Sequence, residues 1–150
     1  MSQALSIGTL LRLPDITPER LQFLRQAGLE CCQLARVGED WLHGPQGADN
    51  SAALMRLLAE HAIKAVSVFL SFPAQRFTAD GGGFGLTPPQ PRAGRIASAC
   101  RQMLWARQHH IDFITCHVGK MPAHGDNDYQ QLIDDLRQVA RFANENGQRF

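Results

Sequence analysis

His117 is the residue of this sequence with the strongest claim to a chemical role. It lies near the end of segment 112–118, an apolar run typical of a buried β-strand, and Gly119 comes shortly after it. A neutral imidazole can ligate a metal, bind a sugar hydroxyl or transfer a proton. A nearby glycine lets a ligand approach the backbone closely. The alternative is a histidine that only completes a local hydrogen-bond network.

Other histidines and one glycine-rich segment have weaker claims. His43 and His124 fall in loops that follow strands, whereas His109 ends a helix, where we expect it to be solvated. The segment 81–85 includes Phe84 and does not match the GxxxxGK[ST] phosphate loop. No helix starts directly after this segment, and we therefore interpret it as a flexible lid.

Apolar and β-branched runs predict four strands, and a helical pattern follows each of them. We expect the strands at residues 4–11, 29–37, 65–70 and 112–118. The four helices should begin at Pro18, near Asn50 or Ser51, near residue 92, and between Asp126 and Asp128.

Local signals support these boundaries. Thr17 followed by Pro18 is typical of a helix start, and Gly28 fits the left-handed position just after a helix end. The spacing within the third helix predicts one inward-facing set of residues, namely Ile96, Cys100, Met103 and Leu104.

Four βα units in succession predict a parallel sheet with strand order 1-2-3-4 and with helices on its outer side. After the fourth helix, residues 148–150 are typical of the start of a fifth strand. Parallel sheets need both faces covered, and a complete (β/α)8 barrel has about 250 residues. We therefore predict an α/β fold of TIM-barrel type, truncated to about four βα units. This half barrel would form one domain over residues 1–150.

The composition is that of an ordinary soluble globular protein. Of the 150 residues, 44% are hydrophobic and 19% charged, and the formal net charge is +1. This balance gives no electrostatic reason to expect nucleic-acid or membrane-surface binding, and no apolar run approaches the ~20 residues that span a bilayer. The N-terminus lacks the pattern of a signal peptide, so we expect a cytoplasmic protein with reduced cysteines.

Carboxylates are scarce at the predicted strand ends. Strands one, three and four end in Leu11, Leu70 and His117. A metal needs several anionic or imidazole ligands that converge on it. No metal site is therefore certain within this chain, although His117 is a candidate ligand.

Three stretches carry a resemblance to a known family: Cys32-Gln33-Leu34, Gly85-Leu86-Thr87-Pro88 with Arg92-Ala93-Gly94-Arg95-Ile96, and His117-Val118-Gly119-Lys120-Met121-Pro122. Together they resemble the sugar phosphate isomerase/epimerase family. Its members are xylose-isomerase-like barrels, related to the AP-endonuclease-type nucleases. The resemblance covers nearly the whole chain but only the N-terminal half of the family's barrel. It implies metal-assisted proton transfer on a ketose or aldose, with a divalent metal (Mn, Mg, Co or Zn) held by strands five to eight.

The resemblance also implies site residues and a substrate. The substrate would be a small-molecule sugar or sugar phosphate. His117 is the candidate catalytic residue, and His117, Gly119 and Phe84 are the candidate substrate-binding residues. The nuclease branch usually has a further histidine at the end of strand three. Here residues 69–72 read Phe-Leu-Ser-Phe, which argues against nuclease activity.

Three functions stay open at this point. The first is the N-terminal part of a sugar isomerase or epimerase, of which this chain alone would be inactive. The second is a catalytically inactive half barrel that self-associates into a homo-oligomer through its open edges. The third is a flavodoxin-like binding module, which needs an acidic cluster or phosphate loop after strand one. Residues 10–14 supply neither.

Overall fold

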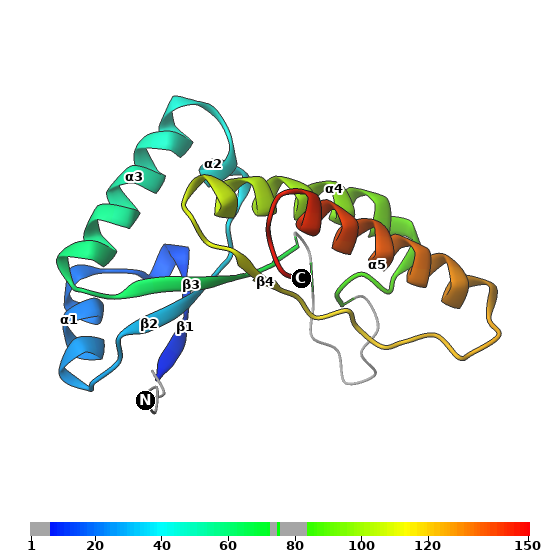
Figure 1. The fold of residues 1–150 in the computed structure, drawn as a ribbon, viewed down its shortest axis with the longest axis horizontal. Coiled ribbons are helices and arrows are strands. Elements are labelled where there is room, and N and C mark those ends of the chain that lie inside the picture. Colours follow the sequence, from blue (N-terminus) through cyan, green and yellow to red (C-terminus); the bar gives the residue numbers. More distant parts are fainter. Residues whose placement is uncertain (1–6, 73–74, 76–83) are drawn as a thin grey trace.

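The computed structural model describes residues 7–72, 75 and 84–150. Within them, four parallel strands form one sheet in the order β1-β2-β3-β4 (Figure 1). The strands are β1 Gly8–Arg12, β2 Cys31–Ala35, β3 Lys64–Phe69 and β4 Phe113–Thr115. Strands that follow each other in the chain are neighbours in the sheet, as predicted. This order excludes a flavodoxin-like sheet, in which the strand order reverses.

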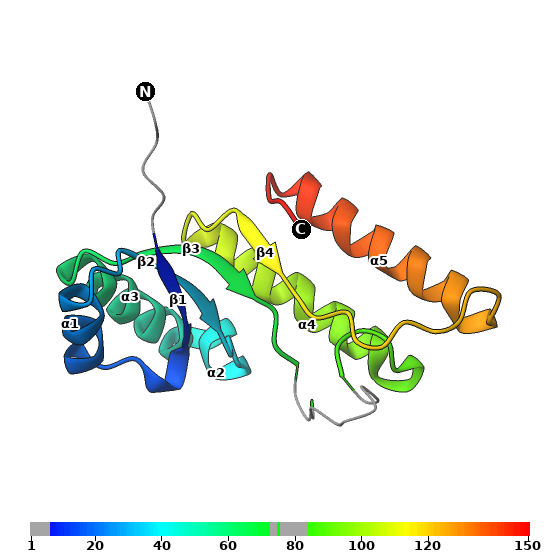
Figure 2. The same cartoon turned by 90° about the horizontal axis from the view of Figure 1, so that it is seen from below.

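Helices cover one face of this sheet, and Figure 2 shows α3 and α4 behind it. The helices are α1 Pro18–Gln26, α2 Glu39–Leu42, α3 Gly44–Glu60, α4 Pro89–Gln108 and α5 Asn127–Glu145, with a 3-10 turn at Leu13–Asp15. The strand residues that face these helices are fully buried, among them Leu11, Leu34 and Val68. The core therefore lies between the sheet and the helices.

The other face of the sheet is open. Along one register row, Leu10, Gln33, Ser67 and Phe113 lie side by side across the four strands. Leu10 is 43% exposed and Phe113 is 50% exposed, so both ends of the row present apolar surface. In the middle, Nε2 of Gln33 donates to Oγ of Ser67 and to Oγ1 of Thr115, each at 2.9 Å. The open face thus has a polar centre between apolar margins.

The predicted boundaries of α1 are confirmed. Oγ1 of Thr17 accepts a hydrogen bond from the backbone N–H of Arg20 at 3.2 Å, and Pro18 is the first helical residue. Gly28 has a φ of +81°, the left-handed conformation expected just past the helix end.

Two helices begin earlier than predicted. Helix α3 starts at Gly44 rather than near Asn50 or Ser51, and α4 starts at Pro89 rather than near residue 92. Each has proline in its first turn, where the missing N–H costs nothing because that position has no partner within the helix. Pro45 and Pro89 both lie in stretches that the sequence predicts as loops. The short helix α2 also occupies a stretch predicted as loop.

The inward face of α4 also differs from the prediction. Ile96 and Met103 are buried as expected, but Leu104 is 44% exposed. Arg92, Arg95 and Gln102 are buried instead. The buried face of α4 therefore includes polar side chains, which a search for apolar residues cannot identify.

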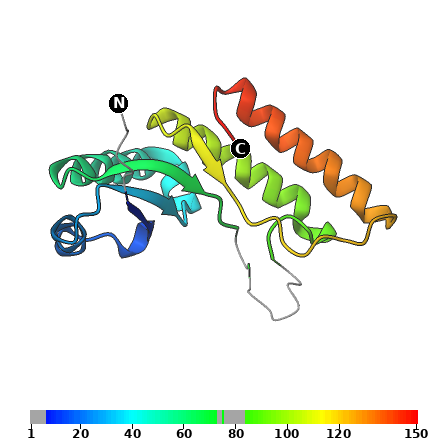
Figure 3. The ribbon, with the colours of Figure 1, turned by 60° about the horizontal axis from the view of Figure 1, so that its bottom comes forward.

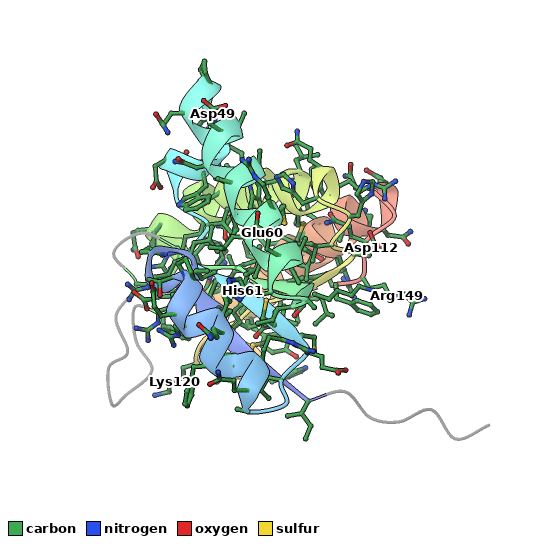
Figure 4. All side chains as sticks on the ribbon, turned by 90° about the vertical axis from the view of Figure 1, so that its left-hand side faces the viewer. Asp49, Glu60, His61, Asp112, Lys120 and Arg149 are labelled. Carbon is green, nitrogen blue, oxygen red and sulfur yellow. The ribbon has the colours of Figure 1, made fainter. Side chains whose placement is uncertain are left out.

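The chain continues past α5 into the start of a fifth strand, as predicted. Arg149 forms a parallel bridge with Phe113 of β4. The N–H of Ile114 donates to the carbonyl of Arg149, and the N–H of Arg149 donates to the carbonyl of Asp112, both at 2.8 Å. Asp112 and Arg149, whose backbones are joined by the second of these bonds, are both labelled in Figure 4. This bridge extends the sheet on the far side of β4.

Two structural observations bear on the compositional expectations. All four cysteines are free, and Cys32 is buried within the core. No helix of the described residues is both long and apolar enough to cross a bilayer.

Candidate functional site

A pocket of about 520 Å³ lies at the carboxyl ends of the strands. In Figure 3 the arrowheads of β2, β3 and β4 point towards this side of the sheet. Strands β1, β2 and β3 and the segment after β4 contribute to its lining, which includes Leu10, Arg12, Ala35, Arg36, Val37, Gly38, Glu39, Phe69, Ser71, Phe72, Ser98 and His117. The carboxyl ends of parallel strands are the face on which barrel enzymes place their active sites.

His117 lies at this pocket, two residues beyond the end of β4. Its ring meets the ring of Phe69 nearly edge-on, with 5.3 Å between centroids and 75° between planes. The ring of Phe84 packs against it from another element at 5.2 Å. The structure therefore brings together two of the residues we predicted for the site. The two aromatic rings restrict the imidazole, and His117 as a whole is exposed.

The turn that carries Phe84 is tied to the segment after β4. The N–H groups of Leu86 and Thr87 both donate to the carbonyl of Val118, at 2.7 and 3.0 Å. Oγ1 of Thr87 in turn donates to the carbonyl of Phe84 at 3.1 Å. These bonds fix the turn that carries Phe84 to the segment that carries His117.

Two glycines make this close approach sterically feasible. Gly85 has a φ of +66°, and a Cβ there would collide with the carbonyls of His117 and Val118. Gly119 has a φ of +105°, and a Cβ there would collide with the carbonyl of Phe84. The chain's own turn therefore takes the close approach that we had assigned to a ligand at Gly119. A contact between Gly119 and substrate stays a prediction.

Arg92 supports the same turn from the helix side. This buried residue donates through Nε to the carbonyl of Leu86 at 2.7 Å and through Nη2 to the carbonyl of Thr87. Its guanidinium also lies 2.8 Å from the Asp128 carboxylate and 3.4 Å from that of Asp135. The rigid fork of an arginine can serve all four acceptors at once, which a lysine cannot. Arg92 thus links the turn to α5.

Arg95, one helical turn further on, has a related role. Its Nη1 donates to the carbonyl of Gly85, and its guanidinium lies over the ring of Phe72, 5.9 Å from the centroid. Burial lowers the pKa of Arg95 below its ordinary value. Arg92 and Arg95 belong to a stretch that carries the family resemblance, but the sequence predicted no role at the site for either of them. Their spacing with Ile96 and Ala99 on one helical stripe was the available signal.

A buried amide fixes the exit of β3. The side chain of Gln102 is fully buried and bonds both backbone groups of Ser71, its Oε1 accepting at 3.1 Å and its Nε2 donating at 2.9 Å. Oγ of Ser71 then accepts from the backbone N–H of Arg36 at 3.2 Å. Arg36 directly follows β2 and has a φ of +62°. This network therefore connects α4 to the pocket wall beside β2.

The pocket also contains one carboxylate, which is already paired. Oε1 of Glu39 lies 2.7 Å from Nη2 of Arg101, and Oε2 lies 2.8 Å from Nε2 of His43. The hydrogen bond from Arg101, followed by weaker contributions that include His43, lowers the pKa of Glu39. Glu39 is therefore a stable anion with two partners.

The remaining predicted histidines do not line the pocket. His43 pairs with a carboxylate as described, and the ring of His124 packs against Tyr129 at 5.2 Å. His109, which we expected to be solvated, packs against Trp105 at 4.9 Å, and burial lowers its pKa. That expectation was wrong because Trp105 is part of the α3–α4 interface and shields the helix end.

The described residues do not fit a divalent metal by themselves. No three His, Cys, Asp or Glu side chains among them are grouped as a metal site requires. Residues 81–83 of the glycine-rich segment lie outside the described residues, and so does most of the lid that we predicted there.

No protein-family model and no curated protein sequence matches the chain. Solved structures do match. A xylose isomerase domain protein from Planctomyces limnophilus superposes on 95% of this chain and 51% of its own, with a TM-score of 0.81 and 19% identity. The fold is that of half a xylose-isomerase-like barrel.

Two further matches support this assignment of the half-barrel fold. A sugar phosphate isomerase/epimerase from Parabacteroides distasonis matches over 99% of this chain and 51% of its own, with a TM-score of 0.60 and 10% identity. An AP endonuclease of family 2 from Brucella melitensis matches over 96% and 53%, with a TM-score of 0.63 and 12% identity. The chain spans about half the length of each. The predicted fold class is confirmed.

Proposed function

We propose that this chain is part of a sugar isomerase or epimerase whose substrate occupies the pocket beside His117. The observation that carries the proposal is the position of that imidazole. It lies at the carboxyl ends of a parallel sheet, between two aromatic rings and on the wall of a pocket of about 520 Å³. Pockets of this size suit a small molecule. The fold shared with sugar isomerases and epimerases supports a sugar as the substrate class.

The chemistry of such a reaction fits the residues present. Interconversion of a ketose and an aldose moves one proton from a carbon to its neighbour and another between the oxygens of those two carbons, whereas epimerisation removes a proton from one carbon and returns it on the opposite face; both can pass through an enediolate. His117 can hold a sugar hydroxyl and move a proton at that oxygen, because a neutral imidazole is both donor and acceptor. Phe69 and Phe84 would exclude water from one side of the sugar.

A divalent metal (Mn, Mg, Co or Zn) remains part of the proposal, but the described residues do not supply its site. Its ligands would come from other residues of the protein, and we assign it no step. Calorimetric titration of this chain with Mn²⁺ and Co²⁺ tests this, and we expect no sub-micromolar binding. Tight binding would show that the site has been misplaced.

An inactive half barrel is the alternative that one observation favours. Leu10 and Phe113 leave apolar side chains exposed on the open face of the sheet, which is typical of an interaction surface. A half barrel that only self-associates through this surface would need no catalytic group.

Exchange of substrate protons distinguishes the two functions. The full-length protein to which this chain would belong is incubated in D₂O with Mn²⁺ and a panel of ketoses, and NMR follows deuterium entering the carbon next to the carbonyl. We expect exchange, and we expect His117→Ala to lower kcat/KM roughly ten- to a thousandfold, or about 1.4–4 kcal/mol. His124→Ala is the matched control and should retain activity, because His124 does not line the pocket and packs against Tyr129. Equal turnover by both variants would show that His117 has only a structural role.

A further inference from the structure

Two arginines from neighbouring strands line the same end of the pocket. Arg12 is the last residue of β1, and its partner across the sheet is Ala35, the residue before Arg36. Neighbouring strands are about 4.8 Å apart, so the two arginines begin from adjacent positions at one edge of the sheet. Both line the pocket that His117 also lines.

Neither cation is neutralised by its surroundings. Among the described residues, no carboxylate forms an ion pair with Arg12 or Arg36. Glu39 also lines the pocket, but Arg101 and His43 already hold its two oxygens. Two neighbouring like charges repel each other, and an anion between them would relieve that repulsion.

The backbone of Arg36 is held in an unusual conformation. Its φ of +62° is in the left-handed region that residues other than glycine seldom adopt. The hydrogen bond to Ser71, which the buried Gln102 orients, fixes it there. Strained residues that their surroundings hold in place cluster at ligand sites. Arg36, in this strained conformation, lines the pocket wall. The hydrogen bonds that hold it there extend through Ser71 to Gln102 of α4.

From these observations we infer that Arg12 and Arg36 form an anion subsite that binds an acidic group of the substrate. A guanidinium offers paired N–H donors that match a phosphate ester or a carboxylate. The inference rests on the proposed function, because it identifies the substrate as an acidic sugar with its acidic end at β1 and β2. The reacting end of the sugar would then face His117.

Paired ligands that differ only in charge test this subsite. Calorimetry measures binding of D-fructose, D-fructose 6-phosphate, D-gluconate and inorganic phosphate to the wild type and to Arg12→Gln and Arg36→Gln. We expect the wild type to bind one of the two acidic sugars more tightly than D-fructose, and each variant to lose that affinity about ten- to a hundredfold. Affinity for D-fructose should change less than twofold. Arg36→Lys should be intermediate, since it keeps the charge but loses the fork.

Arg20→Gln is the matched control, because Arg20 is an exposed arginine of α1 outside the pocket. Thermal unfolding confirms that each variant is folded.

Preference for D-fructose 6-phosphate identifies a phosphate ester as the acidic group, and preference for D-gluconate identifies a carboxylate. Equal affinity for neutral and acidic sugars, or equal loss in the Arg20 control, would overturn the subsite. Arginine-dependent binding without proton exchange would refute the proposed function alone, and exchange on neutral ketoses only would refute the subsite alone.

Discussion

The guanidinium of Arg92 lies 2.8 Å from the carboxylate of Asp128, and this pair joins the first turn of α4 to the first turn of α5. The same guanidinium binds the carbonyls of Leu86 and Thr87. Those two residues donate their N–H groups to the segment that carries His117. The position of the imidazole therefore depends on an ion pair that does not line its pocket.

Replacing Arg92 by methionine should destabilise the fold strongly. Arg92→Met keeps much of the apolar stem but leaves two carbonyls and the Asp128 and Asp135 carboxylates without their partner. Because Asp128 is partly solvated, we expect the free energy of unfolding to fall by about 2–4 kcal/mol, less than for a fully buried pair. Urea denaturation measures this loss.

Arg141→Met is the control for this measurement, since Arg141 lies exposed on α5. It should change the free energy of unfolding by less than about 0.5 kcal/mol. A double-mutant cycle with Asp128→Asn isolates the pair. If the two substitutions are additive, Arg92 and Asp128 do not act together and the link between α4 and α5 is wrong.

Gly85 and Gly94 should respond in opposite directions to the same substitution. Gly85→Ala places a methyl group against the His117 and Val118 carbonyls at a left-handed φ, so the free energy of unfolding should fall by at least about 2 kcal/mol. Gly94 lies within α4 with open space around it, and Gly94→Ala should raise the free energy of unfolding by about 0.5–1 kcal/mol. Thermal unfolding of both variants provides the comparison. A stable Gly85→Ala protein would mean that the turn is not packed against His117.

The sequence was sufficient to predict the strand order because its signals are local. Thr17, Pro18 and Gly28 define one helix without reference to the rest of the chain, and apolar runs define the strands. The start of a fifth strand at residues 148–150 was predicted in the same way. His117 was singled out because its place near the end of a predicted strand already puts it on the face where barrel enzymes hold their active sites.

Local sequence patterns could not predict where the arginines near the pocket lie. Arg12 and Arg36 become neighbours only through the register of β1 on β2, which no short motif encodes. The conformation of Arg36 also depends on a left-handed turn that Ser71 stabilises from the segment after β3. Arg92 shares a helical stripe with Ile96, but a charged residue is assigned to the surface unless its partners are known. Those partners are backbone carbonyls and carboxylates from distant segments.

The buried thiol of Cys32 and the half-buried thiol of Cys116 should make stability depend on alkaline pH. Burial raises the pKa of Cys116 to about 11, and burial followed by the nearby Cys31 raises the pKa of Cys32 to about 12. An unfolded thiol ionises near pH 9. Above pH 9 the unfolded state therefore loses protons that the folded state retains, and stability falls as the pH rises from 9 towards 11. Urea denaturation across this range should show a smaller decline for Cys116→Ala than for the wild type. Parallel declines would show that Cys116 is more accessible than described.

The open face of the sheet should cause self-association. Leu10 and Phe113 end one register row of that face, and β1 has no neighbouring strand on its outer side among the described residues. Exposed apolar side chains and an unpaired strand edge both favour contact with another copy. Sedimentation velocity on the 150-residue chain should therefore show dimers or larger species that increase with concentration.

A pair of charge substitutions locates the contact that causes this self-association. Leu10→Asp with Phe113→Asp places two carboxylates on the open face, and burying them in a contact would require desolvation without a partner. The double variant should sediment as a monomer. Phe23→Asp is the matched control, because Phe23 is 67% exposed on α1 and lies away from the open face. It should leave the association unchanged. A wild-type chain that is monomeric at all concentrations, or an equal effect of Phe23→Asp, would show that the open face is not the surface through which copies meet.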